Sequence, residues 1–275
     1  MIKGIKKFCA IAMFLSLTAA ALAGCGQDKE DVFAGSQYDS DLDYIQDKGS
    51  LVVGVTEFEP LDFMQDGKWV GFDAQMAGLF AQSLGVTAEF VEIDWDRKVD
   101  LLNKGTIDCV WNGMTLTDEV QAEMSCSVAY LNNAQIIVVP SRNSDQIQTV
   151  EDCMHLLFAV EAGSAGEQEL ADRNYRYTTM GTQLDALQSV DSGKADAAVI
   201  DAVMAGSLIG PGKQFESLVD TAALSSEEYG IGFRKNSDLA ELLNAFWKEN
   251  LEDGTVDAAA RQYGVQAAVI GLGQP

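Results

Sequence analysis

Short apolar segments alternate with amphipathic segments of helical period through most of the chain, and this alternation restricts the possible folds more than any other feature. Residues 51–55 read Leu-Val-Val-Gly-Val, which is typical of a buried strand. Apolar residues within 76–84 then recur at helical spacing, and Gly85 ends the predicted helix. Further strands are predicted at 88–93 and 107–111. Strands separated by helices pair in parallel, so we expect an α/β fold with a mostly parallel sheet flanked by helices.

The same order of elements begins again in the second half of the chain. Residues 105–113 (Gly-Thr-Ile-Asp-Cys-Val-Trp-Asn-Gly) are echoed by residues 193–201 (Gly-Lys-Ala-Asp-Ala-Ala-Val-Ile-Asp). Each segment is a glycine turn followed by Asp and an apolar strand, which is consistent with two lobes of like construction. Ligands of open α/β sheets bind at the C-terminal ends of the strands, so Gly113 and Asp201 would face a shared cleft.

Acidic side chains greatly outnumber basic ones. Asp and Glu total 42 and Lys and Arg total 18, for a formal net charge of −24. Neutralising phosphates needs clustered Lys and Arg, so the balance argues against binding to nucleic acid or to anionic lipid. Hydrophobic residues still make up 47% of the chain, enough for a sizeable core. Two interpretations of the charge remain open: a solvated coat, or attraction to a cationic partner.

The first 24 residues predict a lipoprotein signal peptide. Three lysines are followed by the apolar run 8–23, which is too short to span a bilayer comfortably. The run ends Leu-Ala-Gly before Cys25 and is similar to the bacterial lipobox, whose cysteine receives the lipid. An ordinary signal peptide with a chance cysteine is the alternative. Residues 25–44, acidic and polar, would then tether the protein to the outer face of the cell membrane.

Few residues suit metal or nucleophilic chemistry. Cys109, Cys126 and Cys153 remain beyond the signal region, and they are interpreted either as buried free thiols or as one Cys109–Cys126 disulfide with a third thiol. His155 is the only histidine, and no Cys-x-x-Cys or His-x-x-x-His spacing occurs. We therefore expect no metal, no cofactor and no catalytic residue, because a Ser-His-Asp or Cys-His catalyst would depend on His155 alone.

Several segments together resemble the solute-binding proteins of ABC importers, in the family that binds polar amino acids (family 3). The most diagnostic is 111–119, Trp-Asn-Gly-Met-Thr-Leu-Thr-Asp-Glu. The others follow the family's order over about residues 45–265 and lie at 51–55 with 58–60, 70–73, 160–164, 196–201, and 229–235 with 253–255. The resemblance implies a clamshell of the periplasmic-binding-protein type, which closes on a small polar solute, an amino acid or a related amine.

The resemblance also implies a domain division and a role. Lobe 1 would comprise residues 45–131 plus 228–275 and lobe 2 residues 132–227, joined by crossing strands near 130–134 and 226–230. The protein would be a monomer that delivers its solute to an ABC permease, without catalysis. A sensor or adaptor remains an alternative. A dehydratase-like enzyme on the same fold is another, although the shortage of bases counts against it.

Two aromatic and two acidic residues match ligand positions of the family. Phe58 and Trp95 match the side chains that enclose the ligand, with core packing as the alternative. Asp201 matches the acid that pairs with the ligand's α-ammonium, and an N-cap of the next helix is the alternative. Glu57 lies in the loop of Phe58 and would add a second anion.

Two turns match the segments that receive the ligand's carboxylate. Asn112, Gly113 and Thr115 match the turn that offers backbone and hydroxyl groups, and Gly113 allows a close approach. Ser164 and Ala165 match the turn that opens a helix, where N–H groups favour an anion. An ordinary N-cap is the alternative for Ser164.

One position departs from the family pattern. The arginine that grips the α-carboxylate is replaced here by Val120. The carboxylate would then rest on neutral donors at Thr115 and Ser164, or on another cation, with Arg97 and Arg142 as candidates. Alternatively, the ligand lacks that carboxylate, or the protein no longer binds a solute.

Overall fold

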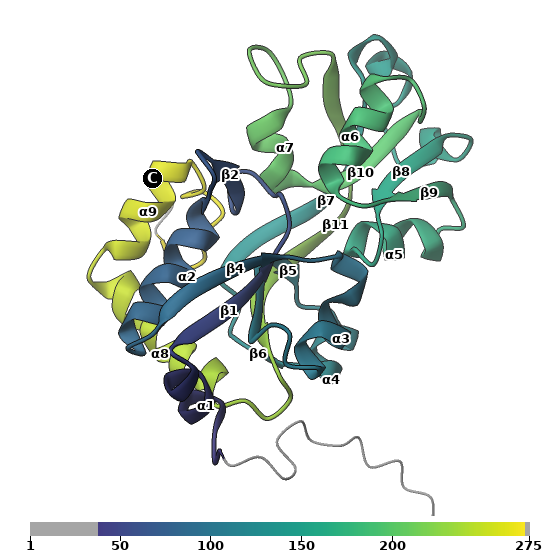
Figure 1. The fold of residues 1–275 in the computed structure, drawn as a ribbon. Coiled ribbons are helices and arrows are strands. Elements are labelled where there is room, and N and C mark those ends of the chain that lie inside the picture. The colour runs from purple at the N-terminus through teal and green to yellow at the C-terminus, as the bar shows by residue number, and fades with distance from the viewer. Residues whose placement is uncertain (1–37, 273–275) are drawn as a thin grey trace, which may run out of the picture. The chain divides into compact units, whose positions relative to one another are not determined.

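The computed structural model describes residues 38–272, and a curled mixed sheet of nine strands runs through them (Figure 1). The predicted signal peptide, Cys25 and most of the predicted tether lie outside these residues. The strand order is β4-β1-β5-β11-β7-β10-β8-β9, and β6 pairs with β11. The nine strands are β1 (Ser50–Val55), β4 (Thr87–Glu92), β5 (Cys109–Thr115), β6 (Ser125–Cys126), β7 (Leu131–Pro140), β8 (Leu157–Glu161), β9 (Arg176–Met180), β10 (Ala197–Asp201) and β11 (Leu218–Phe233). A separate hairpin joins β2 (Phe63–Gln65) to β3 (Lys68–Val70).

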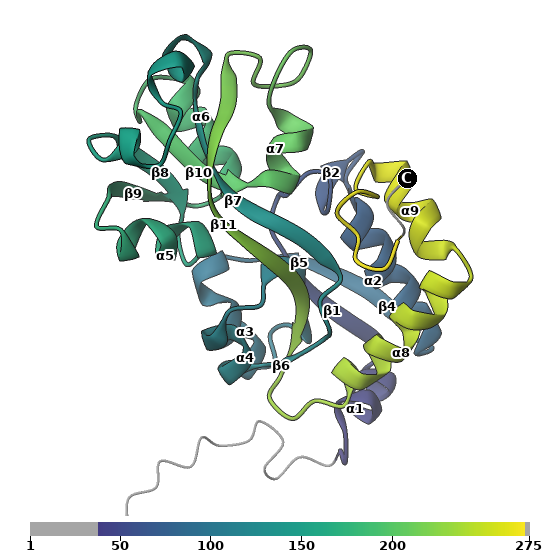
Figure 2. The same cartoon turned by 180° about the vertical axis from the view of Figure 1, so that it is seen from behind.

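Helices flank this sheet, as the alternating pattern predicts. They are α1 (Asp41–Lys48), α2 (Phe72–Ser83), α3 (Lys98–Asn103), α4 (Asp118–Glu123), α5 (Ala165–Asp172), α6 (Gln183–Asp191), α7 (Ala202–Leu208), α8 (Leu239–Glu252) and α9 (Thr255–Tyr263), with short 3₁₀ helices η1 (Trp95–Arg97), η2 (Ser141–Gln146) and η3 (Glu151–Cys153). Helices α2, α8 and α9 pack against one another (Figure 2). Within residues 38–272, none of these helices has the length and apolar character needed to cross a bilayer.

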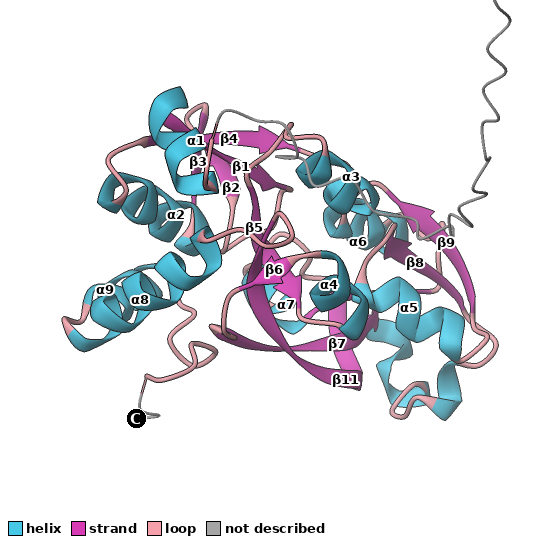
Figure 3. Cartoon of the chain, turned by 90° about the horizontal axis from the view of Figure 1, so that it is seen from below, coloured by secondary structure: helices cyan, strands magenta, loops and turns pink. Residues whose placement is uncertain are grey.

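Parallel pairing occurs in two sets of strands. The first parallel set is β4, β1 and β5, and the second is β10, β8 and β9. Strands β7 and β11 join the sets and run antiparallel to each other, from Leu218 opposite Pro140 to Tyr229 opposite Leu131 (Figure 3). The sequence indicates the parallel sets, but most of β11 and the whole of β9 are missed because their exposed positions dilute the apolar pattern.

Successive residues of β8 show how the second parallel set is buried on both faces. Phe158 packs in one apolar cluster with Leu170 of α5, and Ala159 packs in another with Leu187 of α6. Adjacent side chains of a strand point to opposite faces, so α5 and α6 cover opposite sides of the sheet. This burial explains why β8 and β10 read as continuous apolar runs.

The sequence echo corresponds to a repeated structural unit. Asp108, just before β5, accepts a hydrogen bond from the backbone N–H of Val52 at 2.7 Å, and its own N–H donates to the Val52 carbonyl at 2.7 Å. Asp196, just before β10, makes the same pair of bonds with Leu157, each at 2.9 Å. In each half, the aspartate fixes the start of its strand against the parallel neighbour.

One expected boundary differs in the structure. Residues 41–44, expected within the tether, belong to α1, because Asp41 is buried in an ion pair and the helix seats Ile45 in the core. Helix α8 begins at Leu239, and the carboxylate of the preceding Asp238 accepts hydrogen bonds from the N–H groups of Asp41 and Leu42 in α1.

The three cysteines of the described part are free thiols. Cys109 and Cys153 are buried, and Cys126 is half-buried.

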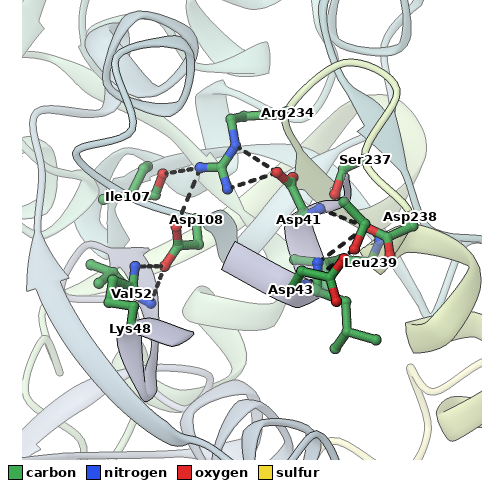
Figure 4. A network of polar contacts seen from close by, with 12 residues as sticks. Asp41, Asp43, Lys48, Val52, Ile107, Asp108, Arg234, Ser237, Asp238 and Leu239 are labelled. Carbon is green, nitrogen blue, oxygen red and sulfur yellow. Dashed lines mark hydrogen bonds and ion pairs between the residues drawn. The ribbon is translucent and has the colours of Figure 1, made fainter. Parts of the chain in front are cut away.

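A buried arginine connects α1 to the sheet (Figure 4). Arg234 is 3% exposed and lies 3.1 Å from a carboxylate oxygen of Asp41 and 3.3 Å from one of Asp108. It also donates to the carbonyl of Ile107 at 3.2 Å. Lys48 pairs with the second oxygen of Asp108. The guanidinium therefore neutralises two carboxylates that are withdrawn from water.

Replacement of this guanidinium should be costly. We expect Arg234→Ala to lower the free energy of unfolding by about 3–5 kcal/mol, because buried Asp41 loses its ion-pair partner and buried Asp108 keeps only Lys48. Urea denaturation measures the change. The control is Arg261→Ala, which removes an exposed pair with Asp257 and should leave the midpoint almost unchanged. Equal midpoints for the two variants would contradict this account.

Candidate functional site

A cavity of about 810 Å³ lies where the C-terminal ends of β5, β8 and β10 converge. Its lining comes from both parallel sets and from the first turns of α4 and α5. This is the edge at which open α/β sheets bind ligands. Eight of the nine predicted ligand residues line it: Phe58, Trp95, Asn112, Gly113, Thr115, Ser164, Ala165 and Asp201.

Glu57 is the predicted residue that does not line the cavity. Its carboxylate accepts a hydrogen bond from the Met64 N–H at 3.2 Å, within the loop that leads to β2. Burial and the neighbouring Glu92 and Glu59 raise the pKa of Glu57, partly offset by that bond.

The aromatic wall is also part of the core. Phe58 is 3% exposed and packs edge-on against Tyr229, with 6.3 Å between ring centroids. Gly113 has φ of +56°, and a Cβ there would lie 2.6 Å from the Phe58 ring. Glycine is therefore required both by the backbone conformation and by the close approach of the ring. The ligand and core interpretations of Phe58 are thus compatible.

Asn112 is fixed by the fold beneath the cavity. Its amide donates to Asp62 at 2.8 Å and to the Thr56 carbonyl at 3.0 Å, and its oxygen accepts from the Thr56 hydroxyl at 2.7 Å. With these partners the side chain positions β5 beside β1 and is not free for a ligand.

The loop before α5 combines a helix cap with the cavity wall. The Ser164 hydroxyl accepts from the Glu167 N–H at 3.1 Å, and the Glu167 carboxylate accepts from the Gly163 N–H at 2.7 Å. Ser164 is thus an N-cap and a lining residue at once. A Cβ on Gly163 would lie 2.6 Å from the Cα of Asp96, so the loop packs directly against η1.

Asp201 ends β10 among amide groups. Its carboxylate accepts hydrogen bonds from Asn133 at 2.5 Å, from Gln135 at 2.6 Å and from Gln183. It stands at the N-cap position of α7 but makes no capping bond, so the N-cap alternative does not explain it. Burial and the nearby Glu227 raise the pKa of Asp201 to about 7. A cationic group would favour the ionised form.

Lys98 is a cavity cation that sequence reasoning missed. It is 8% exposed, and its ammonium donates to the carbonyls of Trp95 at 3.2 Å and Gly163 at 3.0 Å. The same ammonium lies 4.6 Å from the centre of the Trp95 ring. Burial lowers the pKa of Lys98 to about 8, opposed by the charges of Glu161 and two other acids. Its position three residues after the predicted ligand aromatic was the available signal.

The cations proposed from sequence do not reach this cavity. Arg97 is half exposed and lies 3.5 Å from Asp100 and 3.9 Å from Asp94. Arg142 is exposed in η2, and neither arginine is among the lining residues. Val120, which replaces the family arginine, does line the cavity.

Glu161 is a second residue that sequence reasoning missed. It ends β8, is 3% exposed and lines the cavity beside the strand that Asp201 ends. Burial and the charge of Asp201 raise its pKa to about 8, opposed by Lys98. A polar residue at the C-terminal end of an apolar strand was the available signal, since that rule already selected Asp201.

An α/β fold with two parallel sets of strands in its sheet and a polar cavity at the strand ends is the architecture of a solute-binding protein. The model of the bacterial extracellular solute-binding proteins, family 3, matches residues 51–266. The chain belongs to this family, whose members bind amino acids and serve ABC transporters. The resemblance and the fold class predicted from sequence are confirmed.

Individual relatives agree with this assignment. The chain is 29% identical over 229 residues to the L-cystine-binding protein TcyJ of Escherichia coli (strain K12), and the match covers 81% of this chain and 85% of the relative. It is 25% identical to the arginine-binding extracellular protein ArtP of Bacillus subtilis (strain 168), covering 88% and 92%. The crystal structure of the ancestral amino acid-binding protein AncCDT-1, a precursor of cyclohexadienyl dehydratase, matches with a TM-score of 0.75 at 31% identity, covering 82% and 99%.

Stability should depend on pH through the buried acids. A carboxyl whose pKa is raised by folding binds its proton more tightly in the folded state, so its stabilising effect is lost as pH rises from about 4 towards that pKa. Asp201 and Asp73, with pKa values of about 7, and Glu161, at about 8, all act in this direction. We expect the Tm of the unliganded protein to fall by roughly 5 °C or more between pH 5 and pH 8.

Two variants attribute this dependence to the site. The Tm of Asp201→Asn, measured by scanning calorimetry, should fall less steeply over the same pH range, because the variant lacks one carboxyl whose pKa is raised by folding. Asp253→Asn is the control, since exposed Asp253 has a lowered pKa and titrates below this range. A wild-type Tm that rises between pH 5 and pH 8 would contradict the account.

Proposed function

We propose that the protein is an extracytoplasmic solute-binding lipoprotein that captures a polar amino acid or related amine in the cavity and delivers it to an ABC importer. Cys25 would bear the lipid, on the outer face of the cell membrane, and a monomer suffices. The main support is that Asp201 and Lys98 both line the cavity, which gives it a buried acid for an ammonium and a buried base for a carboxylate. No bond in the solute is made or broken.

The proposed lobes meet across the cavity. Lobe 1 is residues 45–131 plus 228–275, and lobe 2 is residues 132–227. Lys98 donates to Gly163 across this division, and the Ser207 hydroxyl donates to Glu59 at 3.2 Å. Such contacts are those that a closed clamshell makes and an open one loses.

The proposed hinge is the crossing of β7 and β11. There Glu227 accepts hydrogen bonds from Asn133 at 2.6 Å and Gln135 at 2.8 Å, and both amides also bind Asp201. Binding of an ammonium at Asp201 would therefore act on groups that lie at the hinge itself.

The proposed ligand contacts follow the charges of the cavity. Asp201 binds the α-ammonium, while Lys98 replaces the family arginine as the cation for the carboxylate. Thr115 and Ser164 also line the cavity and add neutral donors. Trp95 and Phe58 enclose the aliphatic part of the solute.

Calorimetric titration with the common amino acids and amines tests this function. We expect at least one α-amino acid to bind. Asp201→Asn should lower the affinity for that amino acid by roughly 10- to 100-fold, because a charged hydrogen bond is lost. Glu57→Gln is the matched control, because Glu57 lies outside the cavity and its change should leave affinity unaltered. Absence of binding by every compound would contradict the proposal and would favour the loss of solute binding.

The role of Lys98 is tested by comparing solutes with and without a carboxylate. We expect Lys98→Met to weaken the binding of an α-amino acid by roughly 10-fold or more. Binding of the corresponding decarboxylated amine should change much less. Adding Val120→Arg to Lys98→Met should restore about 1.5–3 kcal/mol of binding, the range of a charged hydrogen bond. Equal losses of affinity for the amino acid and for the amine would show that Lys98 does not hold the carboxylate.

A further inference from the structure

One buried carboxylate oxygen of the cavity has no hydrogen bond within residues 38–272. It is Oε1 of Glu161, a residue that is 3% exposed. Buried polar atoms in native proteins almost always find a partner, because an unpaired one has lost its bonds to water without replacement. The oxygen lies on a wall of the cavity, so a solute can provide the missing donor.

The other buried acid of the cavity does not share this property. Asp201 already accepts bonds from three amides. Glu167, which is half-buried, is bound to the backbone of the α5 cap. Glu161 is thus distinguished by an oxygen that has no hydrogen bond in the described part of the chain, although the side chain of Gln183 bonds to the same carboxylate and lowers its pKa.

The charge balance of the cavity favours a positively charged solute. Lys98 is the one base among its described lining residues, and Glu161 and Asp201 are buried acids that line the same cavity. A zwitterionic amino acid brings no net charge, so it would leave Glu161 protonated, in keeping with the raised pKa of that residue. A solute with an additional cationic group would favour the ionised form of Glu161 and pair with it.

We infer that Glu161 forms a second cation subsite, which selects solutes carrying another cationic group besides the ammonium held by Asp201. Basic amino acids and diamines have this chemistry. Neighbouring parallel strands end in the two acids, so one extended solute can contact both. The inference rests on the proposed function and adds to it the class of solute.

Arginine and citrulline provide the test, since they have almost the same shape and differ in the charge of the terminal group. Wild-type protein, titrated calorimetrically, should bind arginine tighter than citrulline by roughly 10- to 100-fold. In Glu161→Gln the preference should shrink to a few-fold, mainly through weaker arginine binding. Agmatine, which is arginine without its carboxylate, is titrated beside them and should follow arginine in its dependence on Glu161.

Control variants separate a subsite from a general effect. Asp172→Asn removes an exposed carboxylate at the rim of the same cavity and should keep the arginine preference. Glu161→Met, an apolar side chain of similar length, is measured with Glu161→Gln so that the comparison does not depend on one variant folding. Thermal unfolding should show that both keep a Tm at or above the wild-type value, because a buried charge is removed.

The outcomes distinguish this inference from the proposed function. Tight wild-type binding of citrulline or another neutral amino acid, with no preference for arginine, would overturn the second subsite and leave amino-acid binding in place. An arginine preference that survives both Glu161 substitutions would overturn it as well, because the preference would arise elsewhere. Failure of every amino acid and amine to bind would overturn both.

Discussion

The antiparallel pairing of β7 with β11 is the contact on which the rest of the structure depends. These strands pair from Leu131 to Pro140 and are central in the sheet order, between the two parallel sets. Without them the two sets would share no hydrogen bonds, and the ends of β5 and β10 would not face one cavity. The same crossing holds Asn133 and Gln135, whose amides bind both Asp201 and Glu227. The backbone pairing and the polar site are therefore one continuous network.

Buried charge is handled differently around Arg234 and in the cavity. The carboxylates of Asp41 and Asp108 are matched by Arg234 and Lys48, and this network fixes α1 on the core. In the cavity, Lys98 is the one base among the described lining residues beside the buried acids Glu161 and Asp201, and an oxygen of Glu161 has no hydrogen bond. A balanced set stabilises the fold, whereas an unbalanced set beside a cavity creates a demand for a ligand.

Much of the site was predictable because it follows the strand pattern. Gly113, Ser164 and Asp201 stand at or near the ends of apolar strands, and eight of nine expected residues do line the cavity. Glu57 does not, because a hydrogen bond to Met64 holds it in its own loop. Asn112 lines the cavity, yet its amide is occupied by Thr56 and Asp62, which sequence spacing could not reveal because those partners are 50 and 56 residues away.

The sequence by itself determined the α/β class, the family, and the absence of an arginine at Val120, since local periodicity and short motifs encode these properties. Only the tertiary structure decided which base lines the cavity. Lys98 lies in a segment that reads as an ordinary short helix, and its ammonium reaches the site because folding brings Gly163, 65 residues away, against η1. The burial of Glu161 and the charge around it likewise depend on residues that are distant in the sequence. These properties do not exist until the chain has folded, which is why the acidic composition alone could not distinguish a solvated coat from attraction to a cationic partner.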